Sequence, residues 1–93
     1  MSQDINNIII SYLQNYDPIR IAVFGSYARN EDRPDSDIDI LVKFSKKVSL
    51  FDLGGMKYDL TELLNRPVDL VTESGLNKNL LPYINKDMKI IFE

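Results

Sequence analysis

Two aspartates separated by one residue are the side chains in this sequence best suited to chemistry. Asp37 and Asp39 begin a mostly apolar run that reads DIDILVKF. Side chains alternate between the faces of a strand, so both carboxylates point to one face, while Ile38 and Ile40 point to the other. Two carboxylates at this spacing can share one metal ion or bridge two. Taken alone, the same pattern also fits a strand whose polar face is solvated.

A third acid makes the metal-site interpretation stronger. Asp69 interrupts the apolar strand VDLVT, and it lies beside Asp37 and Asp39 if the two strands pair. By itself, Asp69 also fits a solvated strand face. The chain has no cysteine and no histidine, so any metal is held by oxygen ligands. Such a site favours a hard cation, Mg²⁺ or Mn²⁺.

A glycine and a serine upstream of these acids could bind phosphate. Gly25-Ser26 ends one predicted strand and begins a short helix, where backbone N–H groups and a hydroxyl are available to an anion. Arg29 and Arg33 follow, and their charges could neutralise the β- and γ-phosphates of a nucleotide. The alternatives are a tight turn with Ser26 as N-cap, and two arginines that are simply solvated.

The periodicity of apolar residues predicts an α/β domain with helices packed on a small sheet. Gly54-Gly55 falls inside the long central helix, at a cost of roughly 1 kcal/mol per glycine relative to alanine. The pair marks either a close approach to another backbone or a weak point. The expected buried stripe of this helix is Leu53, Met56, Leu60, Leu63 and Leu64. The predicted elements are a helix over 3–16, a strand over 19–24, a short helix over 26–32, a turn over 33–36, a strand over 37–44, a helix from the N-cap Ser49 to 64, a strand over 68–72, a helix over 76–86 and a strand over 88–92.

Length and charge narrow the functional class. The 93 residues are enough for a single domain, residues 1–93, with no room for a separate substrate-binding lobe. The net charge of −3 argues against strong general binding to nucleic acid. The apolar runs are too short to cross a membrane, and the N-terminal residues lack the pattern of a signal peptide. A cytoplasmic location is the default expectation.

The segment GSYARNEDRPDSDIDILV resembles the signature of the minimal nucleotidyltransferases of the DNA polymerase β superfamily: Gly-Ser, ten residues, then Asp-x-Asp. The resemblance covers residues 19–93, including Asp69 in RPVDLVTE. It implies a nucleotidyltransferase fold, a small mixed sheet flanked by helices. Asp37 and Asp39 would bind metal and the nucleoside triphosphate, and Asp69 would act as third carboxylate and possible base. Gly25 and Ser26 would bind phosphates. Asn30 replaces a frequent glycine, and asparagine tolerates a left-handed turn.

Stand-alone proteins of this group resemble antitoxins encoded beside a helical HEPN-class ribonuclease toxin. The resemblance implies a type VII-like toxin–antitoxin pair, in which AMP passes from ATP to a tyrosine of the toxin with Mg²⁺ bound. The segment from Leu76 to Tyr83 and the exposed side of the Ser49–Leu64 helix are the predicted contact surface. Two alternatives remain open at this point. The chain could neutralise the toxin by binding alone, or it could be the transferring subunit of an enzyme that modifies a small molecule or RNA.

Overall fold

A four-stranded mixed sheet forms the centre of the molecule, and the computed structural model describes all residues, 1–93. The strand order is β3-β2-β1-β4; β1 is antiparallel to both β2 and β4, while β2 and β3 are parallel. The predicted small mixed sheet flanked by helices is confirmed. In chain order the elements are α1 (Gln3–Leu13), the 3₁₀ helix η1 (Gln14–Tyr16), β1 (Pro18–Phe24), α2 (Gly25–Ala28), β2 (Ile38–Phe44), α3 (Leu50–Leu64), β3 (Val68–Thr72), the 3₁₀ helix η2 (Lys78–Leu80), α4 (Leu81–Asp87) and β4 (Lys89–Phe92).

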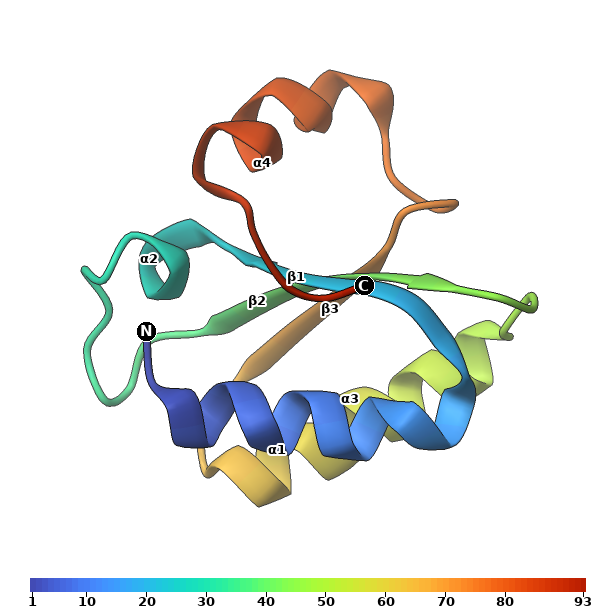
Figure 1. Cartoon of the computed structure of the whole chain (residues 1–93), viewed down its shortest axis with the longest axis horizontal. Helices are drawn as coiled ribbons and strands as arrows, with labels where there is room; N and C mark the ends of the chain where they lie inside the picture. Colours follow the sequence, from blue (N-terminus) through green and yellow to red (C-terminus); the bar gives the residue numbers. More distant parts are fainter.

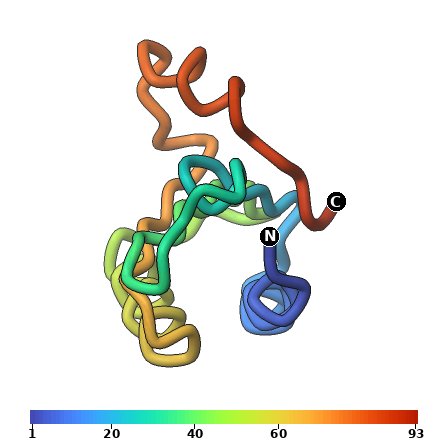
Figure 2. The backbone as a smooth tube through the Cα atoms, turned by 90° about the vertical axis from the view of Figure 1, so that its left-hand side faces the viewer, coloured from blue at the N-terminus to red at the C-terminus, as the bar shows by residue number.

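Helices α1 and α3 lie side by side on one face of the sheet, as both views of the backbone show (Figures 1 and 2). Alternate residues of β2 point to this face, and Ile38, Ile40 and Val42 are completely buried there. They belong to a core of 12 buried residues that also includes Met56 and Leu60 of α3. We call this side of the sheet the α1/α3 face.

The opposite side, the α4 face, is covered much more thinly. Helix α4 arches over it and joins β4 through a short extended segment (Figure 1). Its buried cluster contains only three residues, Ala22, Leu41 and Ile84. Because little apolar surface is buried there, space remains for a pocket between α4 and the sheet.

Side-chain caps fix where the two long helices begin. The Ser2 hydroxyl accepts the N–H of Ile5 at the start of α1. Ser49 is the N-cap of α3, as predicted, and forms a reciprocal capping box with Asp52. At the end of the first helix, the final turn tightens into η1 and Asp17 adopts a left-handed conformation before Pro18.

The structure corrects the predicted extent of two helices and the predicted burial of one leucine. The short helix after β1 ends at Ala28, because Asn30 takes a positive φ of 61° and turns the chain away. The helix predicted over 76–86 is divided into η2 and α4, since Pro82 lacks an N–H and is accommodated only in the first turn of a helix. Leu63 is exposed, because it lies about 100° around α3 from the neighbouring half-buried Leu64.

None of the helices combines the length and the apolar character that crossing a bilayer requires.

Candidate active site

A glycine and two aspartates line up across the three neighbouring strands β1, β2 and β3. Asp39 is paired with Phe24, the last residue of β1, and on its other side with Asp69 of β3. Adjacent strands lie about 4.8 Å apart, so the two carboxylates project side by side from the sheet. Gly25 follows Phe24 directly and begins α2. Parallel pairing of β2 with β3 is therefore what brings Asp69 beside Asp39.

Gly25 cannot be replaced without disturbing Asp39. A Cβ atom built on Gly25 would lie 2.2 Å from Oδ2 of Asp39 and 3.2 Å from its Cγ. The φ of Gly25 is also positive, at 72°, a conformation that side chains with a Cβ rarely adopt. Two independent constraints thus require glycine at this position, and both keep the space beside the Asp39 carboxylate open.

Asp39 carries the most perturbed carboxyl group of the site. Burial, followed by the negative charges of Asp69 and Asp37, raises its pKa from 3.8 to about 6. The positive charge of Arg29 acts in the opposite direction. Burial of a carboxylate beside other carboxylates is unfavourable unless a cation compensates the charge. The electrostatics of the free protein therefore favour a cation at this position.

The chemistry of the donor set also fits such a cation. Asp37, which directly precedes β2, is exposed, and all three side chains offer carboxylate oxygens of the kind that Mg²⁺ prefers. No group of three acidic, histidine or cysteine side chains converges tightly enough here to hold an ion unaided. Mg²⁺ commonly takes only one or two carboxylates from a protein, and phosphate oxygens and water complete its shell. The three aspartates fit that mode of binding.

The loop that carries Asp37 is fixed by an arginine from the segment that leads into β3. The guanidinium of Arg66 donates to the carbonyl of Ser36 at 2.9 and 3.1 Å, and forms an ion pair with Asp32 at 3.0 Å. Both partners of the ion pair are largely buried. The sequence identified Arg66 only as the beginning of a strand, since its contact with a loop 30 residues away depends on the tertiary fold.

A pocket of about 470 Å³ opens beside these acids, between the sheet and the η2–α4 segment. Asp39 and Asp69 line the sheet side, and exposed apolar side chains of Leu80 and Tyr83 line the helical side. The full lining is Phe24, Gly25, Arg29, Asp39, Asp69, Val71, Leu76, Leu80, Tyr83, Ile84, Lys86 and Asp87. The sequence had pointed to Leu76–Tyr83 as a contact surface but gave no signal for Lys86 and Asp87.

Arg29 is one of two cationic residues that line this pocket, together with Lys86. Its Nη1 lies 2.8 Å from Oδ2 of Asp87 on α4, and its Nε lies 3.1 Å from Oε2 of Glu31. These two carboxylates raise the pKa of the Arg29 guanidinium further above its usual value. In the free protein, Arg29 therefore links α4 to the loop after α2, and an anion in the pocket would compete with Asp87 for it.

The remaining predicted phosphate contacts lie outside the pocket lining. Ser26 is the second residue of α2 and is half-buried; Phe24, not Ser26, occupies the N-cap position. Arg33 is exposed, and its backbone N–H donates to the Ser36 hydroxyl. Their roles toward phosphate stay predictions. A positioning contact that sequence reasoning missed is Tyr27, whose buried hydroxyl donates to Asn6 Oδ1 at 2.6 Å and holds α2 against α1.

Comparisons with known proteins agree with this geometry. The nucleotidyltransferase domain family matches residues 5–92. A relative from Methanocaldococcus jannaschii is 45% identical over 74 residues, which cover 80% of each chain. The protein adenylyltransferase MntA of Thermococcus cleftensis is 40% identical over 68 residues, covering 73% of this chain and 69% of the relative.

Solved structures resemble the whole fold. A toxin–antitoxin crystal structure with AMP-PNP aligns with a TM-score of 0.86 at 26% identity, covering 94% of this chain and 72% of the other. A complex of a tri-AMPylated HEPN toxin with its MNT antitoxin, from Shewanella oneidensis, aligns with a TM-score of 0.82 at 26% identity. That match covers 99% of this chain and 72% of the other.

Proposed function

Because the chain belongs to the nucleotidyltransferase domain family, we propose that it transfers AMP from ATP to a tyrosine of a HEPN-class toxin and thereby acts as an antitoxin. The observation that carries the proposal is the row of Gly25, Asp39 and Asp69 at a pocket beside the sheet. The similar toxin–antitoxin structures with AMP-PNP and with an AMPylated toxin support both the nucleotide and the acceptor.

In this proposal the start of α2 receives the triphosphate. The missing side chain of Gly25 leaves room for a phosphate next to Asp39, and the hydroxyl of Ser26 can donate to a phosphate oxygen. Arg29 faces the same pocket, and exchanging Asp87 for phosphate would place its positive charge on the nucleotide. The exposed apolar surface of Leu80 and Tyr83 is available to the rest of the substrate.

The transfer makes one bond and breaks one bond at the α-phosphorus of ATP. The tyrosine oxygen attacks that phosphorus, the bond to the pyrophosphate breaks, and pyrophosphate leaves with the electron pair. The phenolic proton must go to a base, and Asp69, which is exposed on β3 at the edge of the pocket, is the proposed acceptor. Asp37, Asp39 and Asp69 would hold Mg²⁺, whose charge, when it is bound, offsets the negative charge of the phosphates.

The acceptor tyrosine has to be held by another protein. Nucleotidyl transfer depends mainly on positioning, and all the helices and strands of this chain pack around one sheet. A toxin that docks over the η2–α4 segment would bring its tyrosine to the open side of the pocket. A standard interface of about 800 Å² per partner is enough for such a complex.

Intact-mass measurement tests the proposal. A HEPN-class toxin that this chain binds, incubated with the chain, ATP and Mg²⁺, should become heavier by one or more AMP units. Asp39→Asn and Asp69→Asn should each lower the rate of AMP addition by at least about 100-fold. Asp4→Asn is the matched control, because it removes the same charge from an exposed site in the first turn of α1.

One outcome would contradict the proposal as a whole, and two others would each contradict part of it. If the toxin is neutralised but gains no mass, binding alone is the function. If the double variant Asp37→Asn, Asp39→Asn retains full transfer activity, the assignment of these aspartates is wrong. If a small molecule or an RNA accepts the AMP while the toxin does not, the acceptor assignment fails but the transferase assignment stands.

A further inference from the structure

The outer face of α3, formed by Phe51, Gly54, Gly55, Tyr58 and Glu62, is apolar for most of its length yet nothing in the chain covers it. Phe51 is 90% exposed and Tyr58 is 65% exposed. Met56 and Leu60 on the other side of the same helix are completely buried in the core. Helical periodicity explains this, because residues spaced three, four and seven apart share one side of a helix. Helix α3 therefore has two apolar sides, and only one of them packs inside the molecule.

Packing within a single copy of the chain does not require the two glycines at the centre of this outer face. A Cβ atom built on Gly54 or Gly55 would meet nothing within 4 Å. Glycine in a helix interior is unfavourable relative to alanine, and here alanine would fit without a clash. The sequence left two interpretations open, a weak point or a close approach to another backbone. Aromatic side chains on both sides of bare glycines fit a close approach by a helix from outside the chain.

The residues of this face are arranged symmetrically about the glycine pair. Phe51 lies three residues before Gly54, and Tyr58 lies three residues after Gly55. Lys47 lies seven residues before the pair, in the loop that leads into α3, and Glu62 lies seven residues after it. If two copies of α3 pack antiparallel with the glycines at the crossing point, Phe51 faces the partner's Tyr58. At each end Lys47 then approaches the partner's Glu62.

Charge favours this antiparallel arrangement. The ion pairs of the structure involve neither Lys47 nor Glu62, and the contact of Glu62 with the Tyr58 hydroxyl on the same face leaves its negative charge uncompensated. The other two acids beside the outer face already have partners in the chain: Asp52 is part of the capping box, and Asp59 accepts the Tyr12 hydroxyl at 2.5 Å. A parallel pair would place Glu62 against Glu62 and Lys47 against Lys47, which is repulsive.

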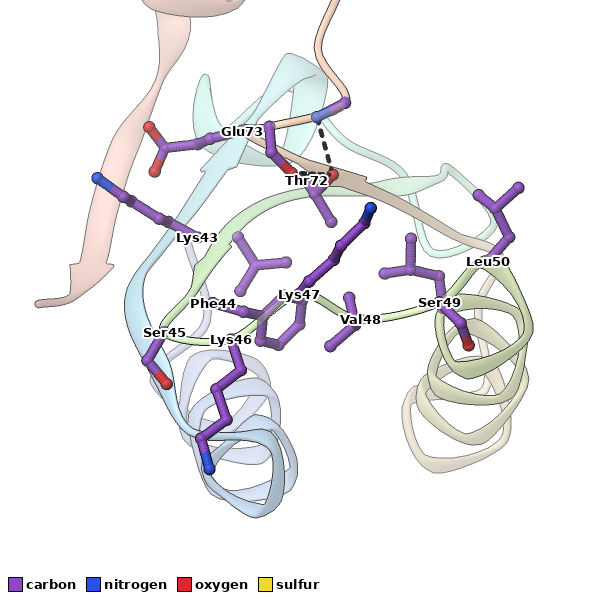
Figure 3. A pocket seen from close by; sticks show the side chains of 14 residues that line it. Lys43, Phe44, Ser45, Lys46, Lys47, Val48, Ser49, Leu50, Thr72 and Glu73 are labelled. Carbon is purple, nitrogen blue, oxygen red and sulfur yellow. Dashed lines mark hydrogen bonds between the residues drawn. The ribbon is translucent and has the colours of Figure 1, made fainter.

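A groove of about 830 Å³ lies beside the first turn of α3 (Figure 3). Leu50, which is 86% exposed, forms one rim, and Lys47 extends from the loop across the groove. Lys43 and Lys46 also line it, and its single acid, Glu73, is paired with Arg20. The N-terminal end of the α3 surface is therefore basic, which complements the Glu62 end of a second copy.

We propose that this chain forms a two-fold symmetric dimer through antiparallel packing of the outer faces of α3. The surface is self-complementary, as a two-fold interface requires. It lies on the α1/α3 side of the sheet, whereas the pocket opens on the α4 face (Figure 1). A toxin whose hydroxyl enters the pocket approaches from the α4 face, so a second copy can occupy α3 at the same time. Self-association leaves both pockets open, and it depends on neither ATP nor the toxin.

Sedimentation velocity of the isolated chain over a range of concentrations tests the dimer. The wild type should pass from monomer to dimer as its concentration rises. Phe51→Glu should raise the dissociation constant by at least about tenfold, because it places a charge opposite the partner's Tyr58. Far-UV circular dichroism confirms that the variant is folded. A wild type that stays monomeric at every concentration would overturn the proposal, and so would a dimer that Phe51→Glu leaves intact.

A charge exchange tests the antiparallel register. Lys47→Glu should weaken the dimer, and Lys47→Glu combined with Glu62→Lys should restore it. Fifteen residues separate the two positions, about 20 Å along a helix, so the restored attraction can act only between copies. Lys89→Glu, the same change at an exposed position of β4, should leave association unchanged. If the double variant is no better than Lys47→Glu, the register is wrong. If Phe51→Glu weakens capture of the toxin instead of self-association, the face belongs to the toxin and the dimer is refuted.

Discussion

The two faces of the sheet differ in what they bury. On the α1/α3 face, 12 residues form a continuous core, and its one buried polar side chain, Asn6, is paired with the Tyr27 hydroxyl. On the α4 face, three residues are buried, and the same side holds Asp39, whose carboxyl group has a raised pKa. One layer thus supplies most of the hydrophobic stabilisation, and the other can tolerate an electrostatically unfavourable site.

This division has a consequence for mutations. Proteins commonly give up stability at functional sites and recover it elsewhere. In this chain the stabilising core and the functional site are separated by the thickness of a single sheet, because neighbouring residues of β2 point to opposite faces. Changes on the α1/α3 face should therefore unfold the protein, whereas changes on the α4 face should alter activity with a smaller effect on folding.

The largest expected effect comes from removing core side chains on the two faces. Leu60→Ala on the α1/α3 face should lower the free energy of unfolding by about 3–5 kcal/mol, because it leaves a cavity in a fully buried cluster. Ile84→Ala on the α4 face should cost less, about 1–2 kcal/mol, because its small cluster lies next to the open pocket. Denaturant unfolding measures both values. Equal losses would show that the α4 face contributes as much to stability as the other.

Gly25→Ala should reduce transfer strongly with a modest effect on folding. The new methyl group would lie 2.2 Å from the Asp39 carboxylate and must displace it. We expect the rate of AMP addition to fall by at least about 100-fold, equivalent to about 2.7 kcal/mol. The positive φ should cost a further 1–2 kcal/mol or so of stability. Gly54→Ala, on the opposite side of the sheet, is the matched control for the rate. A Gly25→Ala variant with normal turnover would place the nucleotide elsewhere.

Asp39→Asn should stabilise the free protein above about pH 6 while it abolishes transfer. The folded-state pKa of Asp39 lies above its ordinary value, so the folded state binds the proton more tightly than the unfolded state. In the wild type, this group therefore lowers the free energy of unfolding as the pH rises from about 4 to 6. After allowance for solvent screening of a half-exposed carboxylate, the gain is about 1 kcal/mol. Denaturant unfolding on either side of this pH range, without Mg²⁺, measures it. A gain of the same size at low and high pH would contradict burial and carboxylate repulsion as its cause.

The smallest expected effect is at the glycine pair of α3. Gly54→Ala and Gly55→Ala should each raise the free energy of unfolding by up to about 1 kcal/mol, measured in dilute solution where the chain is monomeric. In the proposed dimer, the same methyl groups separate the two helices, so the dissociation constant should rise. Thermal unfolding should therefore show a more stable monomer, while sedimentation should show weaker association. A stabilised monomer that also associates more tightly would contradict helix contact at these glycines.

The sequence predicted the strands well because their patterns are local. Each of the four predicted strands lies within one residue of its observed bounds at both ends, since short apolar runs between turn signals leave few alternatives. The capping residue Ser49 was also predicted correctly from its position before the helical repeat. The helix after β1 was predicted too long, and the segment after β3 was predicted as one helix instead of two, because Asn30 and Pro82 act through backbone geometry that periodicity does not report.

What the sequence determined by itself was the chemistry of the site: three carboxylates, no histidine or cysteine, and Gly25-Ser26 separated by ten residues from Asp37-Ile38-Asp39. Strand alternation sent Ile38 and Ile40 into the core, and the acids to the other face. Only the tertiary structure decided that Asp69 stands next to Asp39, that Arg66 holds the intervening loop, and that α4 closes a pocket containing Arg29 but not Arg33. These contacts join residues that are 30 or more positions apart in the chain. They depend on which strands pair and on which side each helix packs, and a local pattern of residues does not encode either choice.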